Sequence, residues 1–453
     1  MLEKLMTTRN HVVIVGGGFA GVYTALALEK LSADAAEMEV TLISRDNYLL
    51  ITPLLFEAGS GILEPRHTVC PIRSMLRQTR FIVAEVASID LEKRNIHAIH
   101  QPDGHLYDVQ YDQLVLAVGG ITNRAIIPGS EDALAFKTLS DAIGLRNKVI
   151  DVLEQANVET DPIRKKYLLT MMVIGAGLVG VELVGELTEF LQNICRIYRN
   201  VRYEEINIIL CEAGPVFLRD LSGDLGGFAH HILEKRGVQI RTSTPVEHIS
   251  AGCVTLSDGT SVAASIILLC AGVAPNPLLA HLELPKNHGR IVVDATMRCP
   301  NRPEVWAIGD CAWIPSGDGK AYPQLAQHAL REARALACNI VHGLRGQALA
   351  PFVYQTLGAL ASLGHYAGVG RVMNIQVRGF LAWWIWRSYY LMQMPGWSRR
   401  LRIIIDWTVS LFFHNDVVKL VVNSEPTLHA TGLIPTLPRE KAAAPIQSPE
   451  NKQ

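Results

Sequence analysis

Two glycine-rich loops in this chain have the residue spacing that binds the pyrophosphate of a dinucleotide. Both follow the pattern G-x-G-x-x-G, in residues 16–21 and 175–180, and each lies between a strand-like apolar run and a helix-like run. The glycines allow a tight turn, a close approach of backbone to phosphate, and close packing of helix on strand, with the phosphates at the helix N-terminus. We predict dinucleotide contacts from Gly16, Gly18, Phe19, Ala20 and Gly21 in the first loop and from Gly175, Gly177, Leu178, Val179 and Gly180 in the second.

The strand that follows each loop ends in residues that could select the nucleotide. In the second unit this strand ends at Glu212, whose carboxylate can accept hydrogen bonds from a ribose diol and repels a 2'-phosphate. Glu212 therefore favours NADH over NADPH, and a solvated glutamate at a strand end is the alternative. In the first unit the corresponding strand ends at Ser44 and Arg45, a pair that by itself would indicate a 2'-phosphate site.

The order of the later apolar strands assigns the two loops to different cofactors. Residues 111–120 and 266–276 close the first and second units and contribute Gly119 and Gly272. Residues 305–312 form a further strand ending at Gly309 and Asp310. In flavoproteins with two dinucleotide domains such a strand returns to the first loop and places an acid near the flavin. The order predicts a nucleotide domain inserted into a split flavin domain, with FAD on the first loop and NADH on the second.

Composition excludes several other classes of protein. The chain has 453 residues, 49% of them hydrophobic, and a formal net charge of -1, so it can bury proper cores and shows no basic excess typical of nucleic-acid binding. Its eight cysteines form no C-x-x-C pair and no zinc-finger spacing, which predicts reduced structural thiols and no metal site. The first ten residues lack the apolar core of a secretory signal, so nothing indicates export.

The region after residue 370 combines aromatic residues with arginines. Tryptophan and tyrosine favour the headgroup level of a membrane, and arginine attracts anionic lipid. No run reaches the ~18 apolar residues of a spanning helix, so the region predicts an amphipathic interfacial anchor, or alternatively a helix pair buried in a dimer contact. The residues concerned are Trp383, Trp384, Trp386, Tyr389, Tyr390, Trp397 and Trp407 with Arg371, Arg378, Arg387, Arg399, Arg400 and Arg402.

Together these motifs resemble those of the type II NADH:quinone oxidoreductases, and the resemblance extends from about residue 11 to about residue 420. The specific segments are NYLLITPLLFE, GDCA, LAQHALREA and PFVYQTLGALASLG followed by GFLAWWIW. The resemblance implies that Pro53 and Leu54 lie beside the flavin and that the backbone of Val86 contacts adenine. It also implies that Glu182 lies at the nicotinamide end of the second loop, where it positions the nicotinamide or joins a proton path. A carboxylate stabilised by the helix dipole is the alternative.

The chain departs from the family pattern at two places. In the family, Ala-Gln with a second glutamine four residues later lies on the quinone side of the flavin; here Ala326 and Gln327 match, but Arg331 replaces the second glutamine. Arg331 could polarise a quinone carbonyl or pair with a nearby acid such as Glu332. Ser44 replaces the usual acid, and its hydroxyl can still bond the FAD ribose.

Together these features predict an α/β protein with two Rossmann-like dinucleotide-binding domains, the second inserted in the first, and a C-terminal helical membrane-interface region. The predicted bounds are 10–125 and 287–350 for the FAD domain, 126–286 for the NADH domain, 351–425 for the C-terminal region and 435–453 for a disordered tail. Resemblance also implies a homodimer.

The predicted enzyme transfers hydride from NADH to flavin and two electrons to a membrane quinone, without proton pumping, at the cytoplasmic face of the cell membrane. The alternatives are a diaphorase with a soluble acceptor, and an FAD- and NADH-binding redox sensor or assembly factor. A sulfide:quinone oxidoreductase or a disulfide reductase would need redox cysteines that this chain does not place near the predicted flavin.

Overall fold

The computed structural model describes residues 9–31, 38–101, 103–221, 223–317, 319–413 and 417–420. The described chain up to Lys419 belongs to one compact unit. The predicted tail, residues 435–453, and the end of the predicted C-terminal region, residues 421–425, lie outside the described residues.

A six-stranded sheet carries the first glycine loop. In spatial order its strands are β22 (Arg298–Cys299), β23 (Arg302–Ala307), β9 (Gln113–Leu116), β1 (Asn10–Val15), β2 (Met38–Ser44) and β5 (Arg80–Val83). All neighbours pair in parallel except β22 and β23. Val12, Val13 and Ile14 in the central strand are fully buried, because both faces of such a sheet are covered. The late strand β23 thus returns to the first unit through β9, as the sequence predicts.

A five-stranded parallel sheet carries the second glycine loop. Its order is β11 (Leu134–Ala135), β18 (Ile266–Leu269), β12 (Thr170–Ile174), β13 (Asn207–Cys211) and β14 (Val238–Arg241). Strand β12 lies between β18 and β13, in the same relation that β1 has to β9 and β2. The repeated strand order confirms the duplicated Rossmann-like unit that the two glycine motifs predict.

The chain passes between the two sheets twice, through a pair of short strands. Strands β10 (Gly120–Thr122) and β19 (Val273–Pro275) pair in antiparallel fashion, and each directly follows the closing strand of its unit. One strand therefore leads out of the first unit and the other leads back toward it, which agrees with an inserted second domain.

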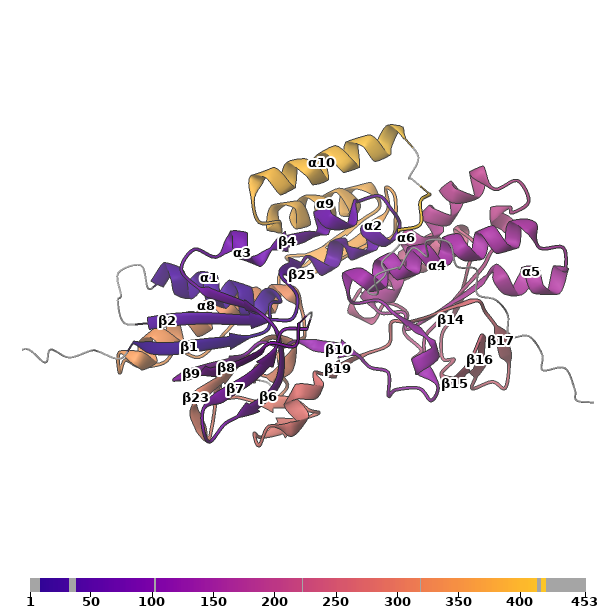
Figure 1. Ribbon diagram of the computed structural model, residues 1–453. Helices are drawn as coiled ribbons and strands as arrows, with labels where there is room; N and C mark the ends of the chain where they lie inside the picture. The colour runs from indigo at the N-terminus through magenta and orange to yellow at the C-terminus, as the bar shows by residue number, and fades with distance from the viewer. Residues whose placement is uncertain are drawn as a thin grey trace, which may run out of the picture. The chain divides into compact units, whose positions relative to one another are not determined.

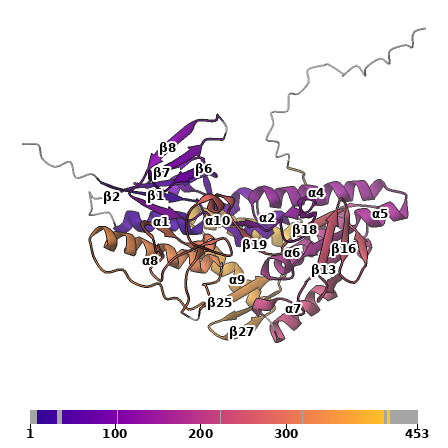
Figure 2. The same ribbon diagram turned by 90° about the horizontal axis from the view of Figure 1, so that it is seen from below.

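Helices cover the sheets and carry the residues after each loop. Helices α1 (Phe19–Leu31) and α8 (Ala326–Leu344) pack side by side against the first sheet (Figures 1 and 2). The second unit is covered by α4 (Leu139–Val158), α5 (Pro162–Leu168), α6 (Leu178–Ile194) and α7 (Asp224–Lys235). Helix α4 begins with a capping box in which Thr138 and Asp141 satisfy each other's backbone amides.

Smaller elements complete the two units. One antiparallel three-stranded sheet consists of β6 (Glu85–Asp90), β7 (Asn95–Ile99) and β8 (Leu106–Gln110). A second consists of β15 (Val246–Ser250), β16 (Cys253–Leu256) and β17 (Ser261–Ala263). A mixed one is formed by β20 (Lys286–Asn287), β21 (Arg290–Val292) and β24 (Ala312–Trp313). The segment after β2 contains β3 (Tyr48–Leu50), the 3₁₀ turns η1 (Thr52–Leu54) and η2 (Pro65–Thr68), α2 (Leu55–Gly59), β4 (Val69–Pro71) and α3 (Ile72–Met75).

The C-terminal region begins with a sheet that the sequence analysis did not foresee. Strands β25 (Gly358–Ser362), β26 (Gly368–Val372) and β27 (Ile375–Arg378) precede α9 (Phe380–Gln393) and α10 (Trp397–Phe412). Helix α9 packs on this sheet, and α10 packs on α9 and η2 (Figure 1). Among the described residues, every helix is too short or too polar to cross a bilayer.

Candidate functional site

The first glycine loop joins β1 to α1 and leaves no room for side chains at two of its glycines. A Cβ on Gly16 would lie 2.2 Å from the carbonyl oxygen of Ala117, and one on Gly21 would lie 1.9 Å from that of Gly16. Gly16 also has a φ of 117°, which favours glycine. A Cβ on Gly18, in contrast, would meet no atom within 4 Å. The start of α1 is therefore open to a ligand, which fits the pyrophosphate of FAD.

The end of β2 lies directly against this loop. Ser44 is 8% exposed, and a Cβ on Gly17 would lie 2.2 Å from its hydroxyl oxygen. Arg45 is exposed and forms an ion pair of 3.3 Å with Asp46. The arginine therefore has an acidic partner beside it, which disfavours a 2'-phosphate site at this loop, in agreement with the assignment of FAD.

The other predicted FAD contacts of this unit lie on elements around the first sheet. Phe19 and Ala20 begin α1, and Ala20 is buried. Pro53 and the buried Leu54 form most of η1, immediately before α2. Val86 lies in β6, opposite Ala98 of β7, and packs on the core of the first unit.

Gly309 and Asp310, after the end of β23, contact residues of α1 and α8 and the side chain of Lys137. A Cβ on Gly309 would lie 3.1 Å from that of Ala20, so the end of β23 reaches the helix of the first loop. The backbone amide of Gly309 donates to Glu332 at 2.7 Å, and burial raises the pKa of Glu332 to about 7. Asp310 lies 3.9 Å from the ammonium of Lys137, and burial lowers the pKa of that lysine while Asp310 opposes the shift.

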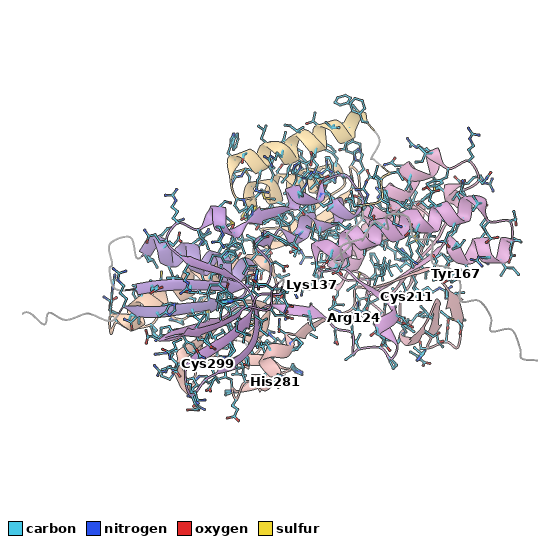
Figure 3. All side chains as sticks on the ribbon, in the orientation of Figure 1. Arg124, Lys137, Tyr167, Cys211, His281 and Cys299 are labelled. Atoms are coloured by element: carbon cyan, nitrogen blue, oxygen red, sulfur yellow. The ribbon has the colours of Figure 1, made fainter. Side chains whose placement is uncertain are left out.

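Lys137 was missed by the sequence analysis. It lies at the junction of the two sheets (Figure 3), and a Cβ on Gly120 would be 3.7 Å from its ammonium nitrogen. It precedes α4 in an ordinary helix-start sequence, so no motif marks it. The predicted Gly119 directly precedes Gly120 in the chain, has a φ of 64° and has open space around its missing Cβ.

The second glycine loop repeats the geometry of the first. A Cβ on Gly175 would lie 2.9 Å from the backbone of Cys270, and one on Gly180 would lie 1.9 Å from the carbonyl oxygen of Gly175. A Cβ on Gly177 would meet nothing within 4 Å. Leu178 and Val179 then begin α6, with Val179 exposed. This loop can accept a second dinucleotide in the same manner.

Glu212 lies under the second loop and holds it. Its carboxylate accepts hydrogen bonds from the backbone amides of Ala176 at 2.8 Å and Gly214 at 2.9 Å. Each oxygen keeps a lone pair for a ribose hydroxyl, so the predicted contact is compatible with these bonds. Gly272 follows β18 with a φ of 76°, and its carbonyl oxygen accepts from Asn123.

Glu182 lies one turn into α6 and faces the C-terminal region. One carboxylate oxygen accepts from the backbone amide of Ser362 at 3.1 Å and from the indole of Trp386 at 2.9 Å. Glu182 is 7% exposed, and burial raises its pKa to about 8, against the effect of these two donors. Because its partners are nearly two hundred residues away in sequence, the sequence analysis identified the glutamate but missed its donors.

Ala326 and Gln327 begin α8, where Gln327 organises the segment before β25. Its amide nitrogen donates to the carbonyl oxygen of Gly358 at 2.9 Å, and its amide oxygen accepts from the hydroxyl of Tyr354 at 3.1 Å. The side chain also contacts the amide of Leu357. Gln327 therefore fixes the loop before β25 through both its amide nitrogen and its amide oxygen.

Arg331 does not form the predicted ion pair with Glu332, and its predicted contact with a quinone carbonyl stays a prediction. It donates to the carbonyl oxygen of Gln327 at 2.9 Å, and its guanidinium lies 4.5 Å from the ring centre of Tyr354. Glu332, the acid suggested as its partner, binds Gly309 instead. Burial and the nearby Arg331 lower the pKa of His328 to about 4, so this histidine is neutral at physiological pH.

A cleft of 570 Å³ lies where α6, α8 and the C-terminal sheet meet. Its volume is within the range of small-molecule sites. The cleft connects the first residue of α6, after the second glycine loop, with the segment that Gln327 organises. It is lined by Leu178, Asp220, Leu221, Pro323, Leu325, Gln355, Thr356, Leu357, Gly358, Ala359, Arg371, Met373 and Asn374.

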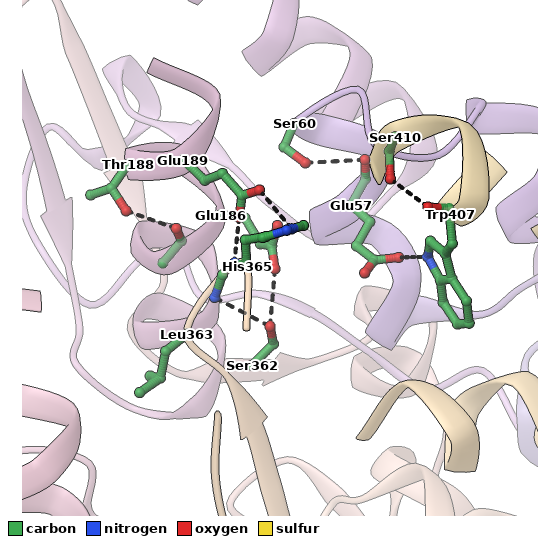
Figure 4. A network of polar contacts seen from close by, with 12 residues as sticks. Glu57, Ser60, Glu186, Thr188, Glu189, Ser362, Leu363, His365, Trp407 and Ser410 are labelled. Atoms are coloured by element: carbon green, nitrogen blue, oxygen red, sulfur yellow. Dashed lines mark hydrogen bonds and ion pairs between the residues drawn. The ribbon is translucent and has the colours of Figure 1, made fainter. Parts of the chain in front are cut away.

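Some of the aromatic and arginine residues that were predicted to face lipid are buried inside the protein. Trp383, Trp386 and Arg387 are at most 6% exposed, which corrects their placement on an interfacial face. Arg387 forms an ion pair of 2.8 Å with the buried Glu57 of α2, and Glu57 also accepts from the indole of Trp407 at 2.7 Å (Figure 4). These residues join α2, α9 and α10, because a buried carboxylate requires such partners.

The cysteines show no redox pair. All eight are free, and five of them are buried. No group of histidine, cysteine and acidic side chains in the described chain could hold a metal ion.

The fold and the two glycine loops define the class of protein. Residues 10–333 match the family model "Pyridine nucleotide-disulphide oxidoreductase", and residues 356–416 match the "NDH2 C-terminal domain". The chain is 30% identical over 420 residues to type II NADH:quinone oxidoreductase Ndh of Mycobacterium tuberculosis, covering 89% of this chain and 88% of that protein. It is 31% identical over 379 residues to the type II NADH:quinone oxidoreductase of Staphylococcus haemolyticus, covering 82% and 92%.

A solved structure shows the same fold. NDH2 from Plasmodium falciparum in complex with NADH matches with a TM-score of 0.84 and 20% identity, covering 91% of this chain and 100% of that one. The chain belongs to the type II NADH:quinone oxidoreductase family. This confirms the predicted resemblance, fold class, enzyme class and cofactor pair of FAD and NADH.

Proposed function

We propose that this enzyme binds FAD at the first glycine loop and NADH at the second, and reduces a membrane quinone. The observation that carries the proposal is the pair of loops with open space at Gly18 and Gly177, within one compact unit. Bound FAD would accept a hydride from NADH and donate two electrons to the quinone.

The residues of the chain would position these ligands and select the nucleotide. Ser44 and Asp310 would contact the FAD ribose and ribityl hydroxyls, and Lys137, 3.9 Å from Asp310, would supply a positive charge near the same end. Glu212 would bond the NADH ribose, and Glu182 would lie at the nicotinamide. Gln327 and Arg331 would face the quinone from the start of α8.

The exposed face of the C-terminal helices supports contact with lipid. On α10 the exposed apolar residues recur at helical spacing, while Ile403 is fully buried on the opposite face. Arginines occupy the first turns of the same helix. The exposed apolar side chains are Phe380, Leu381, Trp384 and Met392 on α9, and Trp397, Leu401, Ile404, Ile405, Val409, Leu411 and Phe412 on α10.

We therefore propose a peripheral membrane protein at the cytoplasmic face of the cell membrane. A homodimer and the lack of proton pumping stay predictions, as do the domain bounds.

The direct test is a flavin spectrum of the purified protein, followed by turnover with a short-chain quinone and either NADH or NADPH. We expect an FAD spectrum and a preference for NADH, because a carboxylate at the proposed ribose position, Glu212, would repel a 2'-phosphate. A colourless protein, or one that oxidises NADH with a soluble dye but never with quinone, would contradict the proposal.

A further inference from the structure

Three glutamates lie in a row on one face of α6. Glu182, Glu186 and Glu189 are spaced four and three residues apart, which places them on the same side of a helix. Glu182 is 7% exposed, Glu186 is 2% exposed and the side chain of Glu189 is 14% exposed. The row runs from the predicted nicotinamide end of the second glycine loop toward the protein surface.

The end of β25 and the turn after it contact all three carboxylates, and Figure 4 shows the contacts to Glu186 and Glu189. The amide of Ser362 donates to Glu182 at 3.1 Å, and the hydroxyl of the same serine donates to Glu186 at 3.0 Å. His365 binds Glu189 through its backbone amide and, at 3.2 Å, through its ring nitrogen. One residue thus joins the first two carboxylates, and a partly exposed histidine joins the third to solvent.

Glu186 itself is incompletely bonded. Its second carboxylate oxygen, Oε2, is buried and has no hydrogen-bond partner among the described residues. A buried carboxylate in this state is costly when charged and acceptable when protonated.

Negative charge outweighs positive charge around this carboxyl. Glu189 faces it from α6 and Glu57 from α2, while Arg387 of α9 is already paired with Glu57. Glu182, one turn earlier on α6, is largely neutral at pH 7 because burial raises its pKa to about 8. The other polar or charged groups on the packed elements are His365, Tyr390, Trp386, Trp407, Arg146 of α4 beside α2, and Arg236, whose guanidinium donates to backbone carbonyls. Burial, then Glu189 and Glu57, raise the pKa of Glu186 well above its ordinary range, against Arg387 and Ser362.

We propose that Glu186 is a neutral carboxylic acid that donates a proton toward Glu182 in each turnover, and that Glu189 and His365 return it from solvent. This inference rests on the proposed function. Oxidation of NADH by a quinone consumes one proton from water for each quinol formed, since the hydride carries both electrons but only one hydrogen nucleus.

The proton transfer is balanced within the chain. Burial raises the pKa of Glu182 to about 8, so Glu182 accepts a proton only after it has given its own proton to the reacting quinone. The O–H bond of Glu186 then breaks, and a new O–H bond forms on the ionised Glu182. Ser362 holds the two carboxyls beside each other, with its hydroxyl on Glu186 and its backbone amide on Glu182. The carboxylate left at Glu186 is repelled by Glu189 and Glu57, which favours its reprotonation through His365. No electrons and no other atoms move.

Infrared spectroscopy of the full-length oxidised protein tests the resting state without turnover. At neutral pH the wild type should show the C=O stretch of one protonated carboxyl that is missing from Glu186→Gln and shifts in heavy water. Thr188→Val is the matched control, because Thr188 is equally buried on α6 and bonds only a backbone carbonyl. Identical carboxyl bands in wild type and Glu186→Gln would overturn the proposal, even in a protein without quinone activity.

Turnover with two acceptors tests the transfer. With a short-chain quinone, Glu186→Gln should lower kcat at least about tenfold, with the NADH KM unchanged within about twofold. Ferricyanide takes electrons without protons, so its rate should be unchanged. Glu186→Asp should restore part of the quinone rate, and Glu189→Gln should slow quinone turnover most at alkaline pH, where solvent protons are scarce.

The outcomes separate the two proposals. Equal losses with quinone and ferricyanide would mean that Glu186 supports the structure or hydride transfer, and would overturn its role as a proton donor. A wild type that never reduces quinone would refute the proposed function, while the infrared comparison still decides the protonation of Glu186.

Discussion

At the scale of single residues, environment gives chemically identical side chains different properties. Glu57 is buried but paired with Arg387 and Trp407. Glu182 is buried with two neutral donors, and its pKa rises to about 8. Glu212 is bound by two backbone amides at a strand end. Burial without a cationic partner therefore distinguishes the glutamate suited to exchanging protons from those suited to holding structure or ligand.

The raised pKa of Glu182 predicts a pH-dependent stability. Its folded pKa lies above the ~4.3 of an unfolded chain, so folding takes up a proton. The contribution of Glu182 to the free energy of unfolding is fully present below the pKa of the unfolded chain, and it is lost as pH rises toward the folded pKa of about 8. Glu182→Gln lacks this dependence. Its free energy of unfolding, relative to wild type, should therefore increase by a few kcal/mol between pH 5 and pH 8, as measured by urea denaturation. A constant difference across this range would show that Glu182 is ionised in the folded protein.

At the scale of elements, each glycine loop is a strand, a turn and a helix whose geometry is local. A Cβ on the first or third glycine of either loop would clash with backbone atoms of the same unit. The middle glycines, Gly18 and Gly177, face open space at the starts of α1 and α6. A substitution at either position tests ligand binding without disturbing the fold, because a methyl group there would touch no other part of the chain.

Gly18→Ala and Gly177→Ala form a matched pair that assigns the two loops. Gly18→Ala should fold normally but retain FAD at least about tenfold less tightly, since the methyl group occupies the place of the phosphate. Gly177→Ala should keep its flavin and show a raised KM for NADH. Flavin content per chain and steady-state kinetics measure both effects. The reverse pattern, with flavin lost only from Gly177→Ala, would exchange the cofactors between the loops.

At the scale of the whole molecule, the C-terminal region serves both units. Its sheet supplies Ser362 to Glu182 of the second unit, while α9 supplies Trp386 to the same glutamate and Arg387 to α2. The opposite face of α9 and α10 exposes apolar side chains. The same helices therefore complete the interior of the site on one side and present a surface suited to lipid on the other.

A double substitution on the exposed face of α10 tests the lipid contact. Leu401→Glu with Ile405→Glu should lower binding to vesicles containing anionic lipid at least about tenfold, because each isoleucine or leucine contributes roughly 1.5–3 kcal/mol when buried. Flotation with the vesicles measures the bound fraction. Ile163→Glu is the control, since Ile163 is an exposed apolar residue on α5, far from this face in sequence. Equal binding by the double variant and wild type would indicate another partner for α10, such as a second copy of the chain.

The sequence alone was sufficient for the two glycine loops, the strand order and the family, because each depends on residues close together in the chain or on a motif. It also identified Glu182 and Gln327, but neither their donors nor the roles of Lys137 and His328. It misplaced Trp386 and Arg387, because an aromatic and basic helix has the same composition whether one face meets lipid or protein. Only tertiary structure decides that question, and it brings Ser362 and Trp386 to Glu182 across nearly two hundred residues. Burial, and with it the pKa of each carboxyl, is a property of the packed molecule that no local pattern encodes.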